Sequence, residues 1–240
     1  MAEEYTFPPY GEEVSKVLEK FGGAKMETYR GKDIRPLWDL KGGPILWSYK
    51  YLWSAPKLEK IAHTVQSFKD RLMCYTTIIW PDDHHALPVF SNFWAESEKG
   101  SYFILDFYPT ADTICDIPYM EKYLDPLEDL WAEGKRHYPV VSTRDPNWFR
   151  VMISPYYINA DFHPSTKQHQ TRLLKLVLDY LNVYHGLWEK DEPREPNYMQ
   201  YLIKRRDAMR WNMKEKDPGG IMMEHAVGHE IAELGLEALF

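Results

Sequence analysis

Residues 72–108, LMCYTTIIWPDDHHALPVFSNFWAESEKGSYFILDFY, decide the fold of this chain. Three segments in this stretch, Leu72–Trp80, Val89–Trp94 and Tyr102–Tyr108, are rich in the aromatic and β-branched residues that favour strands. The connections between them, around 81–85 and 96–100, are short and polar. Short connections join antiparallel neighbours, because a parallel pair needs a crossover of about a dozen residues or more. The stretch therefore predicts an antiparallel meander.

Further elements are predicted on both sides of the meander. The composition of Ile45–Trp53 and Phe149–Ile158 predicts two more strands. Ser165 and Gln168 have the spacing of a capping box at the start of a long amphipathic helix. In all, six segments are predicted to be helical: Gly11–Phe21, Leu58–Lys69, Tyr119–Trp131, Thr166–Trp188, Asn197–Lys216 and Ile221–Leu239. Helices before, among and after the strands predict an α+β fold, a three-layer α/β/α sandwich with a central antiparallel sheet.

Composition narrows the class of protein. The chain has 240 residues with no repeat or Gly/Ser-rich linker, so a single domain, 1–240, is expected. Its net charge of −7 argues against wrapping a nucleic-acid backbone. Two cysteines, Cys74 and Cys115, supply neither a zinc ribbon nor a disulfide scaffold. No apolar run reaches the roughly 20 residues of a membrane span, and the first residues resemble no signal or transit peptide. A cytoplasmic protein is therefore expected.

The sequence lacks the motifs of several large enzyme classes. It contains no G-x-G-x-x-G, no P-loop, no H-E-x-x-H and no G-x-S-x-G. No motif therefore supports a nucleotide-binding, zincin or serine-hydrolase function. Aromatic residues make up 15% of the chain. Flat side chains in that number build either a bulky core or the walls of a pocket for a planar ligand, and composition alone leaves both open.

Four histidines are candidates for proton transfer or metal binding. His84 and His85 follow two aspartates in a turn, where they are either proton shuttles or exposed turn residues. His225 and His229 lie four positions apart on the predicted C-terminal helix and could present one edge to a metal ion. A solvated, charged helix face is the plainer interpretation of that pair, and no metal is expected.

A local basic segment stands out in this acidic chain. Residues 204–216 contain six basic and two acidic side chains, the basic ones including Lys204, Arg205, Arg206 and Arg210. This pattern is typical of a solvated helix face, and equally of a surface whose positive potential steers an acidic partner protein.

Seven short blocks, taken in order, resemble a known family. They are Ile79-Trp80-Pro81, Leu87-Pro88-Val89-Phe90, Ile104 to Pro109, Ser154-Pro155-Tyr156-Tyr157, Lys216-Asp217-Pro218, Val227-Gly228-His229-Glu230 and Ala238-Leu239-Phe240. Each block is common by itself, but their order and spacing from about Leu58 to Phe240 resemble the ferredoxin-dependent bilin reductases, which include phytochromobilin synthases and are related to red chlorophyll catabolite reductase.

The resemblance implies a fold, a substrate and a partner. A linear tetrapyrrole, such as biliverdin or dihydrobiliverdin, would lie between the sheet and the C-terminal helices and be reduced to a phytobilin. The enzyme would bind no cofactor of its own: reduced ferredoxin, docking on the basic segment, would deliver single electrons, and side chains would supply protons to a bilin radical. The family's C-terminal acid falls on Asp217. Residues expected around the bilin are Thr76, His84, His85, Phe93, Asp106, Tyr108 and Ser154.

The chain also departs from the family pattern. The central-strand Asp of the family falls on Phe93, or on Asn92 if a one-residue gap is allowed; the Asn92 amide could then hydrogen-bond a pyrrole or lactam, which makes Asn92 and Asp217 the candidate catalytic pair. A histidine of some members falls on Thr76, and a propionate-binding basic residue falls near Asn159–Asp161. Asp217 itself is also an ordinary helix terminator before proline. The alternative is a non-catalytic tetrapyrrole-binding or carrier protein on the same fold.

Overall fold

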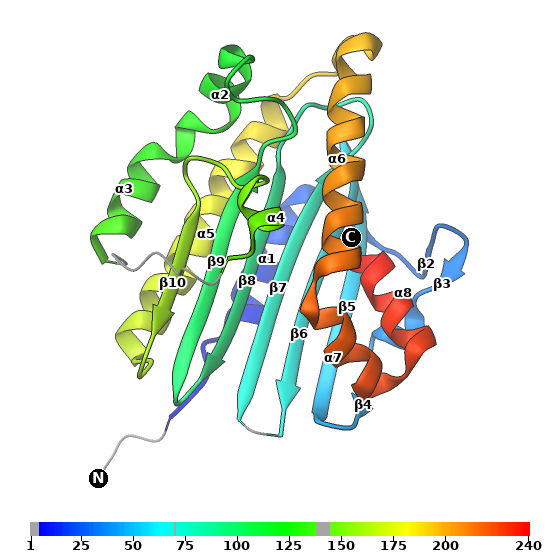
Figure 1. The fold of residues 1–240 in the computed structure, drawn as a ribbon, viewed down its shortest axis with the longest axis vertical. Coiled ribbons are helices and arrows are strands. Elements are labelled where there is room, and N and C mark those ends of the chain that lie inside the picture. The colour runs from blue at the N-terminus through cyan, green and yellow to red at the C-terminus, as the bar shows by residue number, and fades with distance from the viewer. Residues whose placement is uncertain (1–4, 70, 138–144) are drawn as a thin grey trace.

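The computed structural model describes residues 5–69, 71–137 and 145–240. Within them, the core is an eight-stranded antiparallel sheet in the order β1-β5-β6-β7-β8-β9-β10, with β4 also paired to β5 (Figure 1). A separate ribbon consists of β2 (Thr28–Tyr29) and β3 (Lys32–Asp33). The strands of the sheet are β1 (Ala24–Lys25), β4 (Leu40–Gly42), β5 (Ile45–Ala55), β6 (Leu58–Phe68), β7 (Leu72–Pro81), β8 (Val89–Ser97), β9 (Gly100–Tyr108) and β10 (Ile158–Phe162).

Helices cover the two faces of the sheet and so confirm the predicted three-layer sandwich (Figure 1). One face packs against α1 (Tyr10–Leu18) and α5 (Lys167–Lys190), and the other lies under α6 (Pro196–Lys216), α7 (Pro218–Val227) and α8 (His229–Leu239). The remaining helices are α2 (Ile117–Tyr123), α3 (Glu128–His137), α4 (Asn147–Arg150) and the 3-10 turns η1 (Glu19–Phe21), η2 (Arg35–Leu37) and η3 (Asp125–Leu127). The faces are called here the α1/α5 face and the α6–α8 face.

Alternation along each strand assigns every side chain to one face. The α1/α5 face carries the larger core, in which Phe90, Trp94 and Phe107 pack with Tyr180 and Tyr184 of α5. The α6–α8 face carries a smaller cluster, formed by strand residues Ile78, Trp80, Val89 and Tyr108 together with Met152, Met209, Met213 and Phe240. Burial is thus deep on the first face and partial on the second.

Four predicted strands are confirmed, and the predicted helix at Leu58–Lys69 is wrong. That segment is β6, paired with β5 and β7 along most of its length. Leu58, Ile61 and Val65 have helical spacing, but Ala62 and Thr64 between them are buried as well. A strand covered on both faces does not alternate between apolar and polar residues. Its apolar residues can therefore fall at the spacing of an amphipathic helix, as they do here.

The predicted strand at Phe149–Ile158 is also wrong, because the strand β10 begins only at Ile158. The preceding residues form the short helix α4 and irregular chain. Phe149 lies edge-on against Tyr108 at 5.8 Å, and Met152 is buried in the same cluster. The aromatic content of this segment reflects packing onto the sheet rather than membership of it.

Three predicted helices differ from the structure. The single helix predicted at Tyr119–Trp131 is divided into α2, η3 and α3. The N-cap of α5 is Thr166, whose hydroxyl accepts a hydrogen bond from the His169 N–H at 3.2 Å, and Ser165 is not the cap. The single helix predicted at Ile221–Leu239 is two helices, because Gly228 has a φ of 85°, which interrupts the helix at that residue. His225 and His229 therefore lie on different helices and do not form one helical edge. None of the helices in the described ranges is long and apolar enough to cross a bilayer.

Candidate functional site

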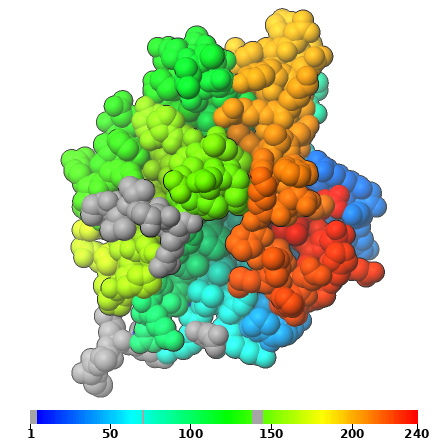
Figure 2. All heavy atoms as spheres, viewed as in Figure 1, coloured from blue at the N-terminus to red at the C-terminus, as the bar shows by residue number. Residues whose placement is uncertain are grey.

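The α6–α8 face has an opening over the middle of the sheet. In a three-layer sandwich, central strands are normally buried on both faces. Here several residues of β7, β8 and β9 that point to the α6–α8 face are half-exposed: Cys74, Thr76, Phe93, Ala95, Tyr102 and Ile104. Figure 2 shows atoms of these strands at the bottom of a depression between α4 on one side and α6–α8 on the other. We call this depression the hollow and the half-exposed residues its floor.

Strand register places the floor in rows across the sheet. One row crosses β5 to β10 on a single face and consists of Lys50, Thr64, Thr76, Phe93, Ile104 and Asn159. The pairing of β8 with β7 and β9 runs without a bulge through this region. Since adjacent residues of a strand point to opposite faces, Phe93 faces the hollow and Asn92 faces away from it.

Asn92 is a buried structural residue of the α1/α5 face. Its side chain is 0% exposed, and its Oδ1 accepts a hydrogen bond from the Tyr10 hydroxyl at 2.6 Å. Its Nδ2 donates to the Ile104 carbonyl at 2.8 Å, and the Tyr10 hydroxyl also bonds the Thr77 hydroxyl at 2.8 Å. These bonds use the amide on the far side of the sheet from the hollow, so the expectation that Asn92 touches a ligand there does not hold in this geometry.

Asp217 lies at the junction between α6 and α7. Its N–H donates to the Met213 carbonyl and ends α6, while its Oδ1 accepts a 2.8 Å hydrogen bond from the Gly219 N–H and caps α7. Asp217 therefore terminates α6 through its backbone, as the plainer interpretation expects, and it caps α7 through Oδ1. Its Oδ2 accepts no hydrogen bond from the described part of the chain. Burial raises the pKa of Asp217, although the Gly219 N–H and the Lys50 cation oppose the rise.

Lys50 begins the floor row and is a functional candidate that the sequence analysis missed. Its ammonium is buried and donates to the Gly235 carbonyl of α8 at 2.5 Å. Burial lowers the pKa of Lys50 to about 8, and the Asp217 carboxylate opposes that change. Beside it in the row, the buried Thr64 hydroxyl has no hydrogen-bond partner within the described residues. The signal was present: in β5 the polar positions Ser48 and Lys50 alternate with aromatic ones.

Asp145 lies at the β9–β10 side of the floor. The sequence analysis did not single out this carboxylate. It is buried and accepts hydrogen bonds from the Tyr102 hydroxyl at 3.2 Å, the Tyr157 hydroxyl at 3.1 Å and the Asn159 amide at 3.0 Å. The Asp145 carboxylate and burial together raise the pKa of Tyr102 to about 12, with burial the larger cause. Tyr102 thus presents a protonated phenol at the edge of the hollow.

Three of the residues expected around a ligand are instead buried supports. Asp106 is 0% exposed and accepts hydrogen bonds from the Ser154 N–H at 2.7 Å, from the Ser154 hydroxyl and from the Phe107 N–H at 2.8 Å. Burial raises the pKa of Asp106 to about 7 against the effect of these bonds. Tyr108 is buried beside them. Asp106, Ser154 and Tyr108 tie the segment before β10 to the sheet and offer a ligand no surface.

The two turn histidines lie at one end of the strands, away from the floor row. The Asp82 carboxylate accepts hydrogen bonds from the His84 and His85 N–H groups and from the His85 Nδ1 at 2.7 Å. His85 is buried and His84 is exposed. This arrangement is a capped turn, so Thr76 and Phe93 are the only two of the seven expected contact residues that line the floor of the hollow.

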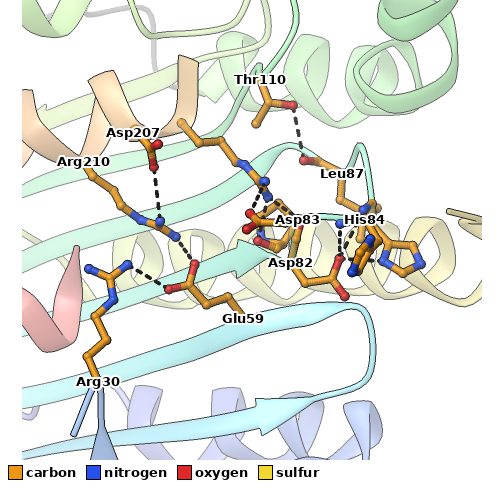
Figure 3. Close-up of polar contacts among 12 residues, drawn as sticks. Arg30, Glu59, Asp82, Asp83, His84, Leu87, Thr110, Asp207 and Arg210 are labelled. Atoms are coloured by element: carbon orange, nitrogen blue, oxygen red, sulfur yellow. Dashed lines mark hydrogen bonds and ion pairs between the residues drawn. The ribbon is translucent and has the colours of Figure 1, made fainter. Parts of the chain in front are cut away.

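Much of the basic segment is turned inward, as Figure 3 shows for Arg210 and its neighbours. Arg206 is 2% exposed and donates to the Pro81 carbonyl at 2.7 Å, the Asp82 carbonyl at 2.6 Å and the Asp83 carboxylate at 2.8 Å. Arg210 pairs with Glu59, and Arg205 donates to the Pro109 carbonyl at 3.0 Å. These arginines bind α6 to the strand ends, and Lys204 is the exposed one of the four residues expected to meet a partner.

The outer surface of α6 and α7 keeps a smaller set of groups for a partner. Lys204, Lys214 and Lys216 are exposed, and the Lys216 ammonium lies 5.4 Å from the ring centre of Trp211, which is 60% exposed. Ile221 and Met222 of α7 are also exposed. Exposed large apolar residues ringed by lysines are typical of a docking surface.

Comparison with known proteins gives a family and a fold. The family model described as ferredoxin-dependent bilin reductase matches residues 33–239. No curated protein sequence matches the chain. The crystal structure of selenomethionine phytochromobilin synthase from tomato in complex with biliverdin matches with a TM-score of 0.79 and 18% identity, over 95% of this chain and 80% of that chain. At that identity the likeness concerns the fold.

Proposed function

The chain belongs to the ferredoxin-dependent bilin reductases, and we propose that it reduces an open-chain tetrapyrrole held in the hollow, with Asp217 as a proton donor. Biliverdin and dihydrobiliverdin are the substrates of choice, and the product is a phytobilin. The observation that carries this proposal is the half-exposed floor of Thr76, Phe93 and Ile104 on the central strands β7, β8 and β9, whose opposite face is buried.

The shape and chemistry of the floor suit a bilin. A bilin is broad and conjugated, with polar pyrrole and lactam groups and two charged propionates. Phe93 and Tyr102 lie 6.2 Å apart between ring centres and offer flat apolar contact. The Tyr102 oxygen, whose proton is donated to Asp145, can accept a hydrogen bond, and the Thr64 hydroxyl has no partner among the described residues. Lys50 and the exposed lysines of α6 are cations on that side of the molecule.

Proton supply is the chemical task of this chain. Ferredoxin transfers one electron at a time and brings no proton, whereas saturating one double bond consumes two electrons and two protons. A carboxyl group with a raised pKa keeps its proton to higher pH than an ordinary carboxyl and is a suitable donor. Asp217 has this property, and its Oδ2 is not used by the helix cap.

Electrons are proposed to arrive through the outer surface of α6. Lys204, Lys214 and Lys216 are free to meet an acidic ferredoxin, with Trp211 as an apolar centre. Opposite charges across such a contact mainly accelerate encounter. Arg206 takes no part in docking, because its guanidinium is buried.

A non-catalytic bilin carrier is the second candidate function. Two floor positions support it: Phe93 and Thr76 lie at the centre of the hollow, and neither can give up a proton near neutral pH. If Asp217 acts only as a helix cap, the hollow would bind a bilin without reducing it.

One experiment separates the two functions. The protein is mixed anaerobically with biliverdin or with 15,16-dihydrobiliverdin, reduced ferredoxin is added, and the absorbance spectrum is followed. The enzyme predicts a new product spectrum that depends on both ferredoxin and the protein. A spectral shift on binding, with no later change after ferredoxin is added, would select the carrier.

A further inference from the structure

Two buried lysines of the sheet attach α8 to the α6–α8 face. Lys50 of β5 donates to the Gly235 carbonyl at 2.5 Å, and Lys60 of β6 donates to the Glu237 carbonyl at 3.0 Å. Both are less than a tenth exposed. A neutral amide would make the same bond to a carbonyl at a smaller desolvation cost than an ammonium. Anchoring α8 therefore does not explain why either residue carries a charge.

The charged surroundings of the two lysines differ. The Lys50 cation and the Asp217 carboxylate each favour the charged form of the other. Lys60 lies instead among Arg210, Glu59 and Arg30, and Lys50 acts on it only weakly by repulsion. Only Lys50 belongs to the floor row of the hollow. On α7, α8 and the last turn of α6, the exposed charged or titratable side chains are Lys214, Glu215, Lys216, Glu224, His225, His229, Glu230 and Glu233, while the half-buried Glu237 pairs with Lys32.

The turn that carries Asp217 is pressed against the same helix that Lys50 anchors. A Cβ at Gly219 would come within 3.1 Å of the Asp217 Oδ1, and a Cβ at Gly220 would come within 3.1 Å of Leu236 in α8. At both positions the neighbouring atoms are so close that glycine fits better than a residue with a side chain. The Lys50 ammonium, the Gly235 carbonyl, α8 and the Asp217 turn thus form one packed unit beside the floor.

We propose that Lys50 is a positioning residue for Asp217: it fixes α8 against the Asp217 turn and, through its charge, sets the pH range over which the Asp217 carboxyl keeps its proton. This role rests on the proposed function of Asp217 as a proton donor. Without the cation the carboxyl would hold its proton to higher pH and release it less readily. With the cation the carboxyl gives up its proton to a bilin radical more readily.

The test compares three variants that make distinct predictions. Lys50→Met removes the charge and the donor, and Lys50→Gln removes the charge but keeps a donor for the Gly235 carbonyl. Lys60→Met is the matched control, because Lys60 also donates to a carbonyl of α8. Single-turnover bilin reduction is measured against pH. In both Lys50 variants the fall in rate on the alkaline side should move to higher pH, because the Lys50 cation lowers the pKa of the Asp217 carboxyl. Lys60→Met should keep the wild-type pH profile.

A second readout does not depend on turnover. The carboxyl carbon of Asp217 is followed by NMR in ligand-free, ¹³C-labelled protein, with Asp217→Asn identifying the signal. Both Lys50 variants should raise the titration midpoint of Asp217, and Lys60→Met should leave it unchanged. An unchanged midpoint in both Lys50 variants overturns the proposal, as does an equal shift in Lys60→Met. So does unfolding of both Lys50 variants beside a folded Lys60→Met, because Lys50 would then serve packing alone. Absence of bilin reduction by the wild-type protein, together with the midpoint shift, would instead count against the proposed function.

Discussion

Phe93 lies directly opposite Thr76 in the β7–β8 pair, and both side chains face the hollow. A phenyl ring and a hydroxyl therefore occupy the centre of the floor, where they provide contact area and one hydrogen bond. Neither side chain is an acid near neutral pH. In the proposed reaction the protons come from the walls of the hollow. Asp217 is the candidate donor, because burial raises its pKa and its Oδ2 accepts no hydrogen bond from the described residues.

Phe93 and Asn92 are adjacent in sequence, yet their substitution should affect different properties. Phe93→Ala removes flat contact from the floor and should weaken bilin affinity by about tenfold, the equivalent of about 1.4 kcal/mol, while the free energy of unfolding changes little. Asn92→Ala removes one of the two hydrogen bonds of the Tyr10 hydroxyl and the Nδ2 donor of the Ile104 carbonyl. It should lower the free energy of unfolding by about 1–3 kcal/mol with bilin affinity unchanged. Absorbance titration with biliverdin and urea unfolding measure the two effects. The reverse outcome would place Asn92 in the hollow.

The docking surface is tested by reversing its charge. In Lys204→Glu/Lys214→Glu/Lys216→Glu, ferredoxin-dependent turnover should fall at low salt, and the deficit relative to wild type should shrink as ionic strength rises, because exposed charges are screened. Bilin affinity, measured without ferredoxin, is the control and should stay within a few-fold of wild type. Equal ferredoxin kinetics in the two proteins at low salt would exclude this surface.

Arg206 should behave as a structural residue. Arg206→Ala leaves the carbonyl groups of Pro81 and Asp82 without their donor and should lower the free energy of unfolding by about 2–4 kcal/mol. Lys204→Ala, on the exposed side of the same helix, should change it by less than about 0.5 kcal/mol. Urea unfolding of the two variants checks the contrast. A stability of Arg206→Ala equal to that of Lys204→Ala would mean that the guanidinium is not used internally.

Asp106 predicts a specific dependence of stability on pH. Its folded pKa, about 7, lies above the unfolded value of roughly 3.9, so the folded state binds the proton more tightly and this contribution to stability is lost as pH rises toward 7. Asp106→Asn removes the titration. The difference in unfolding free energy, wild type minus Asp106→Asn, should therefore decrease by on the order of 2 kcal/mol between pH 5 and pH 7. A difference that is flat or grows with pH would contradict the assignment.

The sequence predicted the fold well where strands were short and bounded by turns. β7, β8 and β9 have polar connections, and the pattern of α5 is strongly periodic, so these elements were found within a few residues. It failed for β6, whose two buried faces hide the alternation, and for the segment before β10, whose aromatic residues pack on the sheet as irregular chain. Local patterns do not report which faces are covered by distant helices.

The site was predictable only in part for the same reason. Asp217 and Phe93 were found because they fall on positions of a family pattern. The inward direction of Arg206 depends on carbonyl groups more than 120 residues away in the chain, and the role of Lys50 depends on the Gly235 carbonyl of α8. Strand register decides whether Asn92 or Phe93 faces the hollow. The family pattern leaves this open, because a gap of one residue moves the family position from Phe93 to Asn92.

The central claim, that Asp217 donates a proton to a bilin in the hollow, is tested most directly by single-turnover absorbance of bilin bound to Asp217→Asn. Asparagine keeps the size of the side chain and an acceptor for the Gly219 N–H but has no acidic proton. The account predicts that the variant binds bilin with near wild-type affinity, accepts an electron from reduced ferredoxin and then accumulates a radical spectrum, with product formation slowed at least about 100-fold. A normal product spectrum formed at the wild-type rate would contradict it.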